Sequence, residues 1–288
     1  MLHWQLTVVG KARINESESV WNMLLAQSPR ARGGAWLMRF HLERALVEPG
    51  DTWMMSFDEP VPDFSQAQEI YRGEHTRVCL HPDRLALVSK LSIVQAVPRD
   101  PFRKYRYCQA AREIAAADVL VRLGLRTPTM RGFGYTLMPW ARHESILFMD
   151  EFPPSRPLRF VFREDLSEPR RHGLLAGVAT GLGRVYAAGY HLKDFHFENI
   201  LSDRENRLIW IDNDLRHTNR YSLAARRFAD ALRRLHKTSE RFLFTSEWHY
   251  LLDGLGRALN TSALGQHLAG KVLPRFRIDT SACHFDVF

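Results

Sequence analysis

The stretch from Gly189 to Asp214, GYHLKDFHFENILSDRENRLIWIDND, constrains this chain more than any other part of it. An acid, Asp194, stands five residues before an amide, Asn199, and an apolar run that follows a polar turn ends on Asp212. Two short apolar runs around a polar turn predict a β-hairpin. Asn199 and Asp212 offer oxygen ligands for a divalent cation, and Asp194 offers a carboxylate that accepts a proton from a hydroxyl. Phosphoryl transfer from Mg-ATP requires these groups.

The spacing of these residues resembles that of protein kinases, in which the catalytic Asp precedes a metal-binding Asn by five positions. The 13 positions from Asn199 to Asp212 are similar to the separation between that Asn and the Asp of D-F-G. The form Asp-x-His-x-x-Asn, followed by Ile-Asp-x-Asp, resembles the lipopolysaccharide core heptose and Kdo kinases, a family of the protein-kinase-like superfamily. Taken singly, each acid could cap a turn and His196 could be a loop histidine, but the ordered set indicates a kinase-type site.

The resemblance implies an α+β, bilobal, protein-kinase-like fold with ATP between the lobes. We expect a small β-rich N-lobe over residues 66–149 and a mostly helical C-lobe over residues 150–288. Residues 1–65 form an N-terminal extension with no assigned role, in which the sequence suggests short helices over 17–27 and 37–46.

The resemblance also implies the roles of the residues in the central stretch. Asp194 is the expected catalytic residue, and His196 helps to position phosphate or the catalytic acid. Asn199 and Asp212 are the expected ligands of Mg²⁺. His191 stands three residues before Asp194, whereas the protein-kinase histidine stands two before, so we assign it no catalytic role.

A lysine inside an apolar run supplies the next candidate. Residues 85–93 predict a β-strand that contains Lys90, and an unpaired ammonium is costly to bury, so Lys90 needs an anion unless it points to solvent. The alanine-rich run 110–123, with Gly124 as its stop, predicts a helix that carries Glu113. The resemblance implies that Lys90 and Glu113 form the ion pair that positions the ATP phosphates; the alternative for Glu113 is an exposed helical acid.

Further ATP-binding candidates lie around these elements. Strands predicted over 133–138 and 145–149 lead to Asp150, Glu151 and Phe152, which the resemblance identifies as the inter-lobe hinge that holds adenine, with Phe148 behind it. A strand pair predicted over 69–80 turns at Gly73. The expected nucleotide-covering loop has that one glycine where protein kinases have three. Side-chain donors there could replace backbone amides toward phosphate, namely Arg72, His75, Thr76 and Arg77.

The second half of the chain predicts helices. Residues 170–189 place one apolar stripe at helical spacing, and residues 156–169 before them indicate a polar connector. A helix over 222–237 carries basic residues outside its apolar face: Arg226, Arg227, Arg233, Arg234 and Lys237. That face is either plain solvated surface or a landing surface for the phosphates of a glycolipid or membrane. Residues 243–288 predict one or two closing helices and a tail.

The composition limits which cellular compartment and which binding partners we expect for this chain. Forty basic and thirty-two acidic side chains give a net charge of +8, which suits an anionic partner. Three widely spaced cysteines form no disulfide framework, and neither a signal peptide nor an 18-residue apolar window is present. We therefore expect a cytoplasmic protein, in peripheral contact with the cytoplasmic face of the inner membrane if its substrate is a glycolipid. No nucleic-acid motif appears, and nucleic acid is not an expected partner.

The predicted function is ATP- and Mg²⁺-dependent phosphorylation of a sugar hydroxyl, with heptose or Kdo of the lipopolysaccharide inner core as the acceptor that the resemblance implies. One alternative is a pseudokinase or binding module that retains the fold, and another is a kinase for a different small molecule or for protein. A third is a metal-dependent phosphoesterase that uses His191, Asp194 and His196, against which the kinase-like order of elements argues. No long activation segment follows Asp212, which disfavours a peptide substrate.

Overall fold

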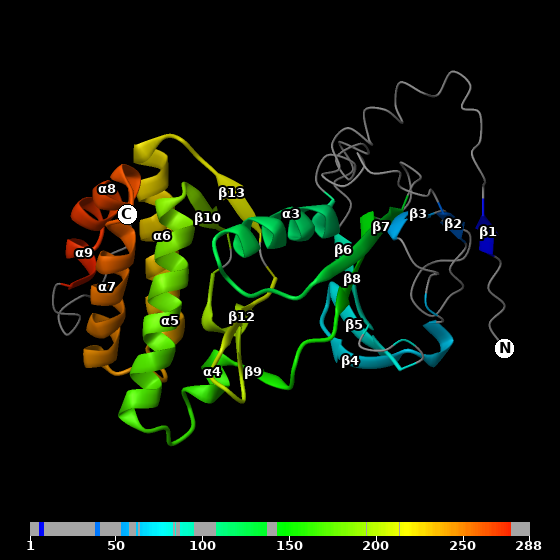
Figure 1. The fold of residues 1–288 in the computed structure, drawn as a ribbon, viewed down its shortest axis with the longest axis horizontal. Helices are drawn as coiled ribbons and strands as arrows, with labels where there is room; N and C mark the ends of the chain where they lie inside the picture. Colours follow the sequence, from blue (N-terminus) through cyan, green and yellow to red (C-terminus); the bar gives the residue numbers. More distant parts are fainter. Residues whose placement is uncertain are drawn as a thin grey trace. The chain divides into compact units, whose positions relative to one another are not determined.

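The computed structural model (Figure 1) describes residues 6–8, 38–40, 53–57, 62, 64–82, 84, 87–94, 108–136, 143–193, 195–212 and 214–277. The chain forms two compact units. The first unit comprises Met1–Ala115 and Pro128–Phe152, and the second comprises Ala116–Thr127 and Pro153–Phe288. Among the helices within these described ranges, none is long and apolar enough to cross a membrane.

The first unit is built on an antiparallel sheet in the order β1-β2-β3-β7-β8-β6-β5-β4. The central strands β6 and β8 are rich in leucine, valine and isoleucine and bury residues on both faces, as central strands do. The predicted strands over 69–80, 85–93, 133–138 and 145–149 are all present, with shifted ends. The strands are β1 (Leu6–Val8), β2 (Met38–Phe40), β3 (Trp53–Phe57), β4 (Gln68–Arg72), β5 (Thr76–His81), β6 (Leu87–Val94), β7 (Met130–Thr136) and β8 (His143–Asp150). A short 3-10 helix, η2 (Phe64–Gln66), precedes β4.

The N-terminal segment contributes strands to this sheet, where we expected a separate extension. The helix predicted over 37–46 is wrong at Met38–Phe40, which form β2, and the helix predicted over 17–27 lies outside the described residues. Strand β3 pairs along its whole length with β7, from Trp53 opposite Thr136 to Phe57 opposite Gly132. Strand β2 pairs in turn with β3, with Met38 opposite Met55, and this pairing satisfies backbone groups that a sheet edge would leave open, a gain that overrides weak local helix propensity.

Helix α3 (Gln109–Arg122) confirms the helix predicted over 110–123, and the boundary between the units passes through it. Ile114 belongs to the core of the first unit, whereas Leu120 is buried in the core of the second. The Trp210 N–H donates to the Arg126 carbonyl at 2.8 Å. Residues 116–127 therefore group with the second unit, although the sequence had suggested that they belong to the N-lobe.

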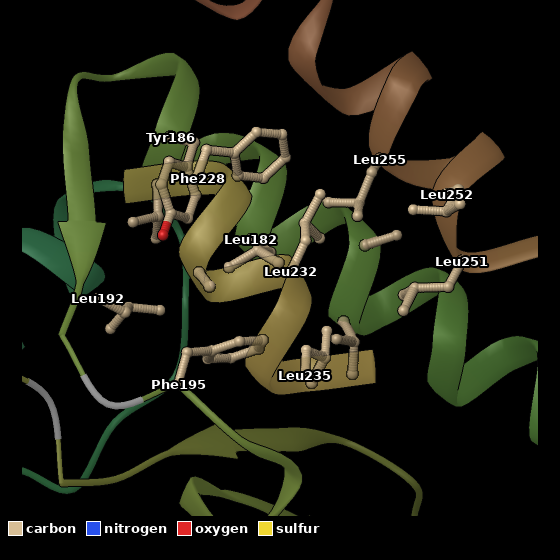
Figure 2. Close-up of a cluster of buried hydrophobic side chains, with 14 of the residues drawn as sticks. Leu182, Tyr186, Leu192, Phe195, Phe228, Leu232, Leu235, Leu251, Leu252 and Leu255 are labelled. Atoms are coloured by element: carbon tan, nitrogen blue, oxygen red, sulfur yellow. The ribbon is translucent and has the colours of Figure 1, made fainter. Parts of the chain in front are cut away.

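The core of the second unit lies between its long helices, and Figure 1 shows α5, α6 and α7 side by side. Figure 2 shows Leu182 and Tyr186 of α5 beside Phe228 and Leu232 of α6, with leucines of α7 close to them. The predicted stripes are confirmed, since their apolar residues are buried in α5 and α6. The helices are α4 (Leu158–Val161), α5 (Glu168–Ala187), α6 (Tyr221–Ser239), α7 (Thr245–Leu259), α8 (Ala263–Lys271) and α9 (Pro274–Arg277).

Small residues allow α5 to pack closely on its neighbours. A Cβ on Gly183 would lie 2.3 Å from the Ala258 Cβ of α7, and a Cβ on Gly181 would lie 2.4 Å from the Trp210 ring. After the end of α5, Gly189 has a φ of +81°, a left-handed conformation that glycine adopts without steric cost. The chain thus turns directly from the buried helix into the central loop.

Short strands complete the second unit. They form a three-stranded sheet in the order β12-β11-β9 and a pair of β10 with β13. The polar connector predicted over 156–169 is wrong in its first half, which forms part of β9 and then α4, with Leu158, Val161 and Phe162 buried. The charged residues on either side, among them Arg156 and Arg163, had hidden this single apolar turn. The elements are β9 (Ser155–Pro157), β10 (Tyr190–Leu192), η3 (Phe197–Asn199), β11 (Ile200–Asp203), β12 (Leu208–Trp210) and β13 (Leu215–His217).

Candidate functional site

The first unit holds a buried ion pair at the centre of its sheet. Lys90 lies in β6, opposite Leu147 of β8. Its Nζ is 3.0 Å from each carboxylate oxygen of Glu113 on α3, and Gln109 donates to the same carboxylate at 3.0 Å. The two charged side chains are 12% and 5% exposed. The structure therefore joins the two residues that the sequence had paired, and their role toward a nucleotide stays a prediction.

In the second unit, the β11–β12 hairpin brings together the two candidate metal ligands. Its last strand pair is Ile200 opposite Trp210, and one step further the Ile211 N–H donates to the Asn199 carbonyl at 3.0 Å. Asp212 follows directly. Asn199 thus lies opposite Ile211, the residue before Asp212, so both candidate ligands stand at the open end of the hairpin, although the sequence separates them by 13 positions.

Asp212 has an unusual backbone conformation. Its φ is 53°, in the left-handed region that residues other than glycine rarely adopt, although Asp tolerates it better than most. Its side chain is exposed, whereas Trp210, two residues before it, is buried and stacked on Phe195 with 5.7 Å between ring centroids. Such conformations cost free energy, persist where the surroundings impose them, and cluster at functional sites. The anchored strand therefore presents an exposed carboxylate in an imposed geometry.

The loop that precedes Asn199 is held at both of its ends. Its first end is tied to the segment after Asp212, because the Lys193 N–H donates to the Asp214 carbonyl at 3.2 Å. At the other end the Asn199 N–H donates to the His196 carbonyl at 3.0 Å. Phe195 and Phe197 are buried, and His196 between them is half-buried. Asp194 lies outside the described residues, so its catalytic role stays a prediction.

His191, a member of the phosphoesterase alternative, is buried in β10. Burial lowers the pKa of its imidazole, and the charges of Arg227 and Arg216 lower it further, against an opposing effect of Asp214. The neutral form of His191 is therefore favoured.

A buried carboxylate that the sequence analysis missed holds the turn of the β11–β12 hairpin. Asp203 accepts hydrogen bonds from the backbone N–H groups of Glu205 and Arg207, both at 2.9 Å. The Arg207 side chain donates to it at 2.7 Å, and that of Arg126 at 3.2 Å. Burial raises the pKa of Asp203, but these hydrogen bonds outweigh it and lower the pKa to about 2. The ionised Asp203 thus holds the turn of the hairpin whose other end carries the two candidate ligands.

The oxygen donors at the end of the hairpin fit Mg²⁺ better than a softer metal. Within the part of the chain that the structure describes, no group of three His, Cys, Asp or Glu side chains could hold a metal ion. A structural zinc site needs four such ligands, whereas Mg²⁺ usually keeps several waters and binds one or two protein oxygens together with substrate phosphates. Asn199 and Asp212 supply a pair of that kind.

The expected hinge residues differ in what they can offer to adenine. Asp150 ends β8, its N–H donates to the Thr129 carbonyl at 2.9 Å, and its carboxylate accepts from Arg131 at 2.5 Å. Its N–H is thus already used within the first unit. Glu151 is exposed and Phe152, the last residue of that unit, is half-buried. Phe148, expected behind the hinge, is fully buried in β8.

The turn expected to cover the nucleotide joins β4 to β5. The Gly73 N–H donates to the Thr76 carbonyl at 2.8 Å and closes the turn. The guanidinium of Arg72 makes two hydrogen bonds of 2.7 Å to Glu69 within the same strand. One of the side-chain donors proposed for phosphate, Arg72, and the Gly73 N–H are therefore engaged by other groups in this structure.

Comparison with known proteins identifies the fold. No protein-family model and no curated protein matches the sequence. The structure is similar to that of WaaP in complex with acyl carrier protein, with a TM-score of 0.50 and 19% sequence identity, over 73% of this chain and 90% of that chain. The predicted fold class is confirmed: the chain has a kinase-like α+β fold, with a β-sheet in its N-terminal part and helices in its C-terminal part.

Proposed function

We propose that the protein is a phosphotransferase that moves the γ-phosphoryl group of Mg-ATP to an alcohol hydroxyl of a saccharide. The observation that carries this proposal is the placement of Asn199 and Asp212 at the same end of the hairpin, where Asn199 pairs with Ile211 and Asp212 follows in a left-handed conformation. The likeness of the fold to that of WaaP supports it.

Each part of the reaction has a candidate in the chain. The Lys90 ammonium, held by Glu113, binds the α- and β-phosphates, and His196 positions the γ-phosphoryl group. Asn199 and Asp212 hold Mg²⁺, which neutralises charge on the phosphate oxygens. Asp194 orients the acceptor hydroxyl and accepts its proton. The backbone groups of residues 151–152 receive the adenine.

The acceptor that we favour is a heptose or Kdo sugar of the lipopolysaccharide inner core. The loop motif resembles that of the kinases that modify these sugars, and the fold is similar to that of WaaP. Such an acceptor would place the protein at the cytoplasmic face of the inner membrane. The exposed arginines of α6 and the net charge of +8 are suited to that anionic surface.

A second candidate is a binding module that keeps the fold without catalysis. The observation that favours it is the glycine-poor turn at Gly73, whose N–H is used by Thr76 and whose neighbour Arg72 is held by Glu69. The buried Lys90–Glu113 pair argues against this module, since it brings together the two residues proposed to hold the ATP phosphates.

A transfer assay with radiolabelled ATP and a panel of core oligosaccharides separates the two. We expect transfer by the wild type and by Asp165→Asn, a control that removes an exposed acid away from the hairpin. Asp212→Asn and Asp194→Ala should each lower kcat by about 100-fold or more, while Asp194→Ala leaves ATP binding nearly intact. If Asp194→Ala kept full activity, that residue would leave the mechanism. If the wild type bound ATP but transferred to no acceptor, the binding module would be favoured.

A further inference from the structure

A cavity of about 380 Å³ lies within the second unit, beside the loop that carries His196. Three segments line it: α4 with the turn after it, the start of η3, and the last turn of α6 with the residues that follow. Its volume is in the range of small-molecule sites. The polar residues around it are Arg159, Arg163, His196, Glu198, Lys237 and Arg241, together with the Thr238 hydroxyl.

The charge of this cavity is unbalanced. Four cationic side chains face one acid, Glu198, and Glu198 is already paired with Arg159. The other three, Arg163, Lys237 and Arg241, are exposed, and none has an ion pair with a carboxylate among the described residues. The three cations therefore leave the cavity with an excess of positive charge, which favours an anionic ligand.

The floor of the cavity is aromatic and packed. Phe197 and Phe242 line it, with their rings edge to face at 5.5 Å between centroids, and Phe162 contacts both from beneath at 5.7 and 6.1 Å. Phe197 and Phe162 are buried. An apolar floor lowers the local dielectric constant and so strengthens the attraction of the surrounding cations for an anion.

A solvated surface explains this arrangement less well. The partial negative charge at the end of α6 stabilises Lys237, but Arg163 and Arg241 lie outside that helix. Cations gathered in one concave site repel each other, and such a site raises the local concentration of anions. The cavity also includes His196, two residues after the expected catalytic acid and three before Asn199.

We propose that this cavity binds an anionic group of the acceptor, a carboxylate or a phosphate, close to the hydroxyl that receives the phosphoryl group. The proposal rests on the proposed function for the identity of the acceptor, whereas the anion site itself can be tested without turnover. It assigns the chain to saccharide acceptors that carry an anionic group near the acceptor hydroxyl, and against saccharides without such a group.

The first test measures anion binding in the absence of nucleotide. Isothermal titration with inorganic phosphate, and separately with acetate, compares the wild type with the triple variant Arg163→Gln, Lys237→Gln and Arg241→Gln. The matched control neutralises three other exposed cations, Arg204→Gln, Lys271→Gln and Arg275→Gln. Lys90→Met reports any phosphate bound by the nucleotide-binding lysine.

We expect the cavity variant to bind phosphate at least about tenfold more weakly, and added salt to weaken binding to the wild type. The control should match the wild type, and any loss in Lys90→Met measures phosphate bound at the nucleotide site. An equal loss in the control, or no loss in the cavity variant, would overturn the anion site. The stronger of the two ions identifies phosphate or carboxylate as the preferred group.

The second test uses the transfer assay with acidic and neutral acceptors. In the cavity variant, KM for acidic acceptors should rise by about tenfold or more with kcat little changed, because the loop and hairpin residues are untouched. Equal KM values for acidic and neutral acceptors in the wild type would overturn the inference and leave the kinase proposal standing. Absence of transfer to every acceptor would count against the kinase proposal, and the phosphate titration would still decide the cavity.

Discussion

At the scale of single residues, Lys90 has a structural role and a proposed chemical one, and they can be separated. Its ammonium is buried against Glu113, which also accepts from Gln109. Removing one partner of a buried ion pair leaves the other charge uncompensated, whereas replacing both by apolar groups is often neutral. Loss of stability and loss of nucleotide binding should therefore respond differently to single and double substitutions.

We predict that Lys90→Met lowers the free energy of unfolding by about 3–5 kcal/mol and abolishes ATP binding. The double variant Lys90→Met, Glu113→Leu should regain most of the stability but none of the ATP binding. Urea denaturation and nucleotide titration measure the two effects. Normal ATP affinity in the stable double variant would show that the pair is structural only.

Asp212 is a single residue whose backbone conformation, and not only its side chain, depends on the packing around it. Its left-handed conformation follows a strand whose Trp210 is buried, so packing imposes the conformation that the exposed carboxylate adopts. The acid could be identified from its position at the end of an apolar run. Its backbone conformation could not, because φ depends on the contacts of its neighbours.

At the scale of elements, α5 positions the hairpin through one glycine. A Cβ at Gly181 would lie 2.4 Å from the Trp210 ring, whereas a Cβ at Gly173, on the same helix, would meet nothing within 4 Å. Gly181→Ala should destabilise the protein by about 1–3 kcal/mol through overpacking and reduce transfer by moving β12. Gly173→Ala should stabilise it by about 0.5–1 kcal/mol, because alanine is the better helix former. Thermal unfolding measures both, and changes of the same sign would contradict the argument.

The hairpin should also respond to pH through Asp203. Its pKa falls from 3.8 to about 2 on folding, so its contribution to stability is fully present above pH 3.8 and is lost as the pH falls toward 2. We predict that Asp203→Asn costs about 2–3 kcal/mol at pH 7, where the carboxylate accepts its charged hydrogen bonds. The gap between wild type and variant should close as pH 2 is approached. A gap of constant size in urea denaturation across this range would contradict the role of the ionised carboxylate.

At the scale of the whole molecule, part of the excess positive charge lies on the exposed face of α6. Arg226, Arg227, Arg233 and Arg234 are exposed, while the apolar residues of the helix are buried. Exposed arginines near an anionic surface attract it over a distance that salt shortens. The face is therefore suited to an anionic glycolipid, and binding through it should depend on ionic strength.

Replacing these four arginines by glutamine should weaken binding to vesicles that contain anionic glycolipid by about tenfold or more at low salt. The control replaces four exposed cations elsewhere, namely Arg204, Arg257, Lys271 and Arg275. Cosedimentation at several salt concentrations measures the effect, which should fade as salt increases. Equal weakening by the control set would show that net charge alone is responsible.

Buried contacts between distant segments mark the limit of what the sequence predicted. Arg171 was part of a predicted helix and carried no sign of burial. In the structure it pairs with Glu247, 76 residues away, and donates to the carbonyls of Phe162 and Phe242 at 2.8 Å. The Arg126–Asp203 pair spans 77 residues. The sequence around each of these residues does not reveal its partner, because a charged side chain in a helix or turn has the same local sequence pattern whether it is paired or solvated.

The candidate functional residues, their order and the long periodic helices and strands could be identified from the sequence alone, because spacing and side-chain periodicity are local properties. These residues are Lys90, Glu113, Asp194, Asn199 and Asp212. The structure pairs Lys90 with Glu113 and, separately, places Asn199 and Asp212 at the same end of one hairpin. Tertiary packing was needed to show that the first strands extend the sheet, that Asp203 holds the hairpin turn, and that cations in and just after α4 and α6 surround one cavity. Those outcomes depend on which distant segments pack together, since burial and charge pairing are free energies of the folded assembly and not of any single stretch.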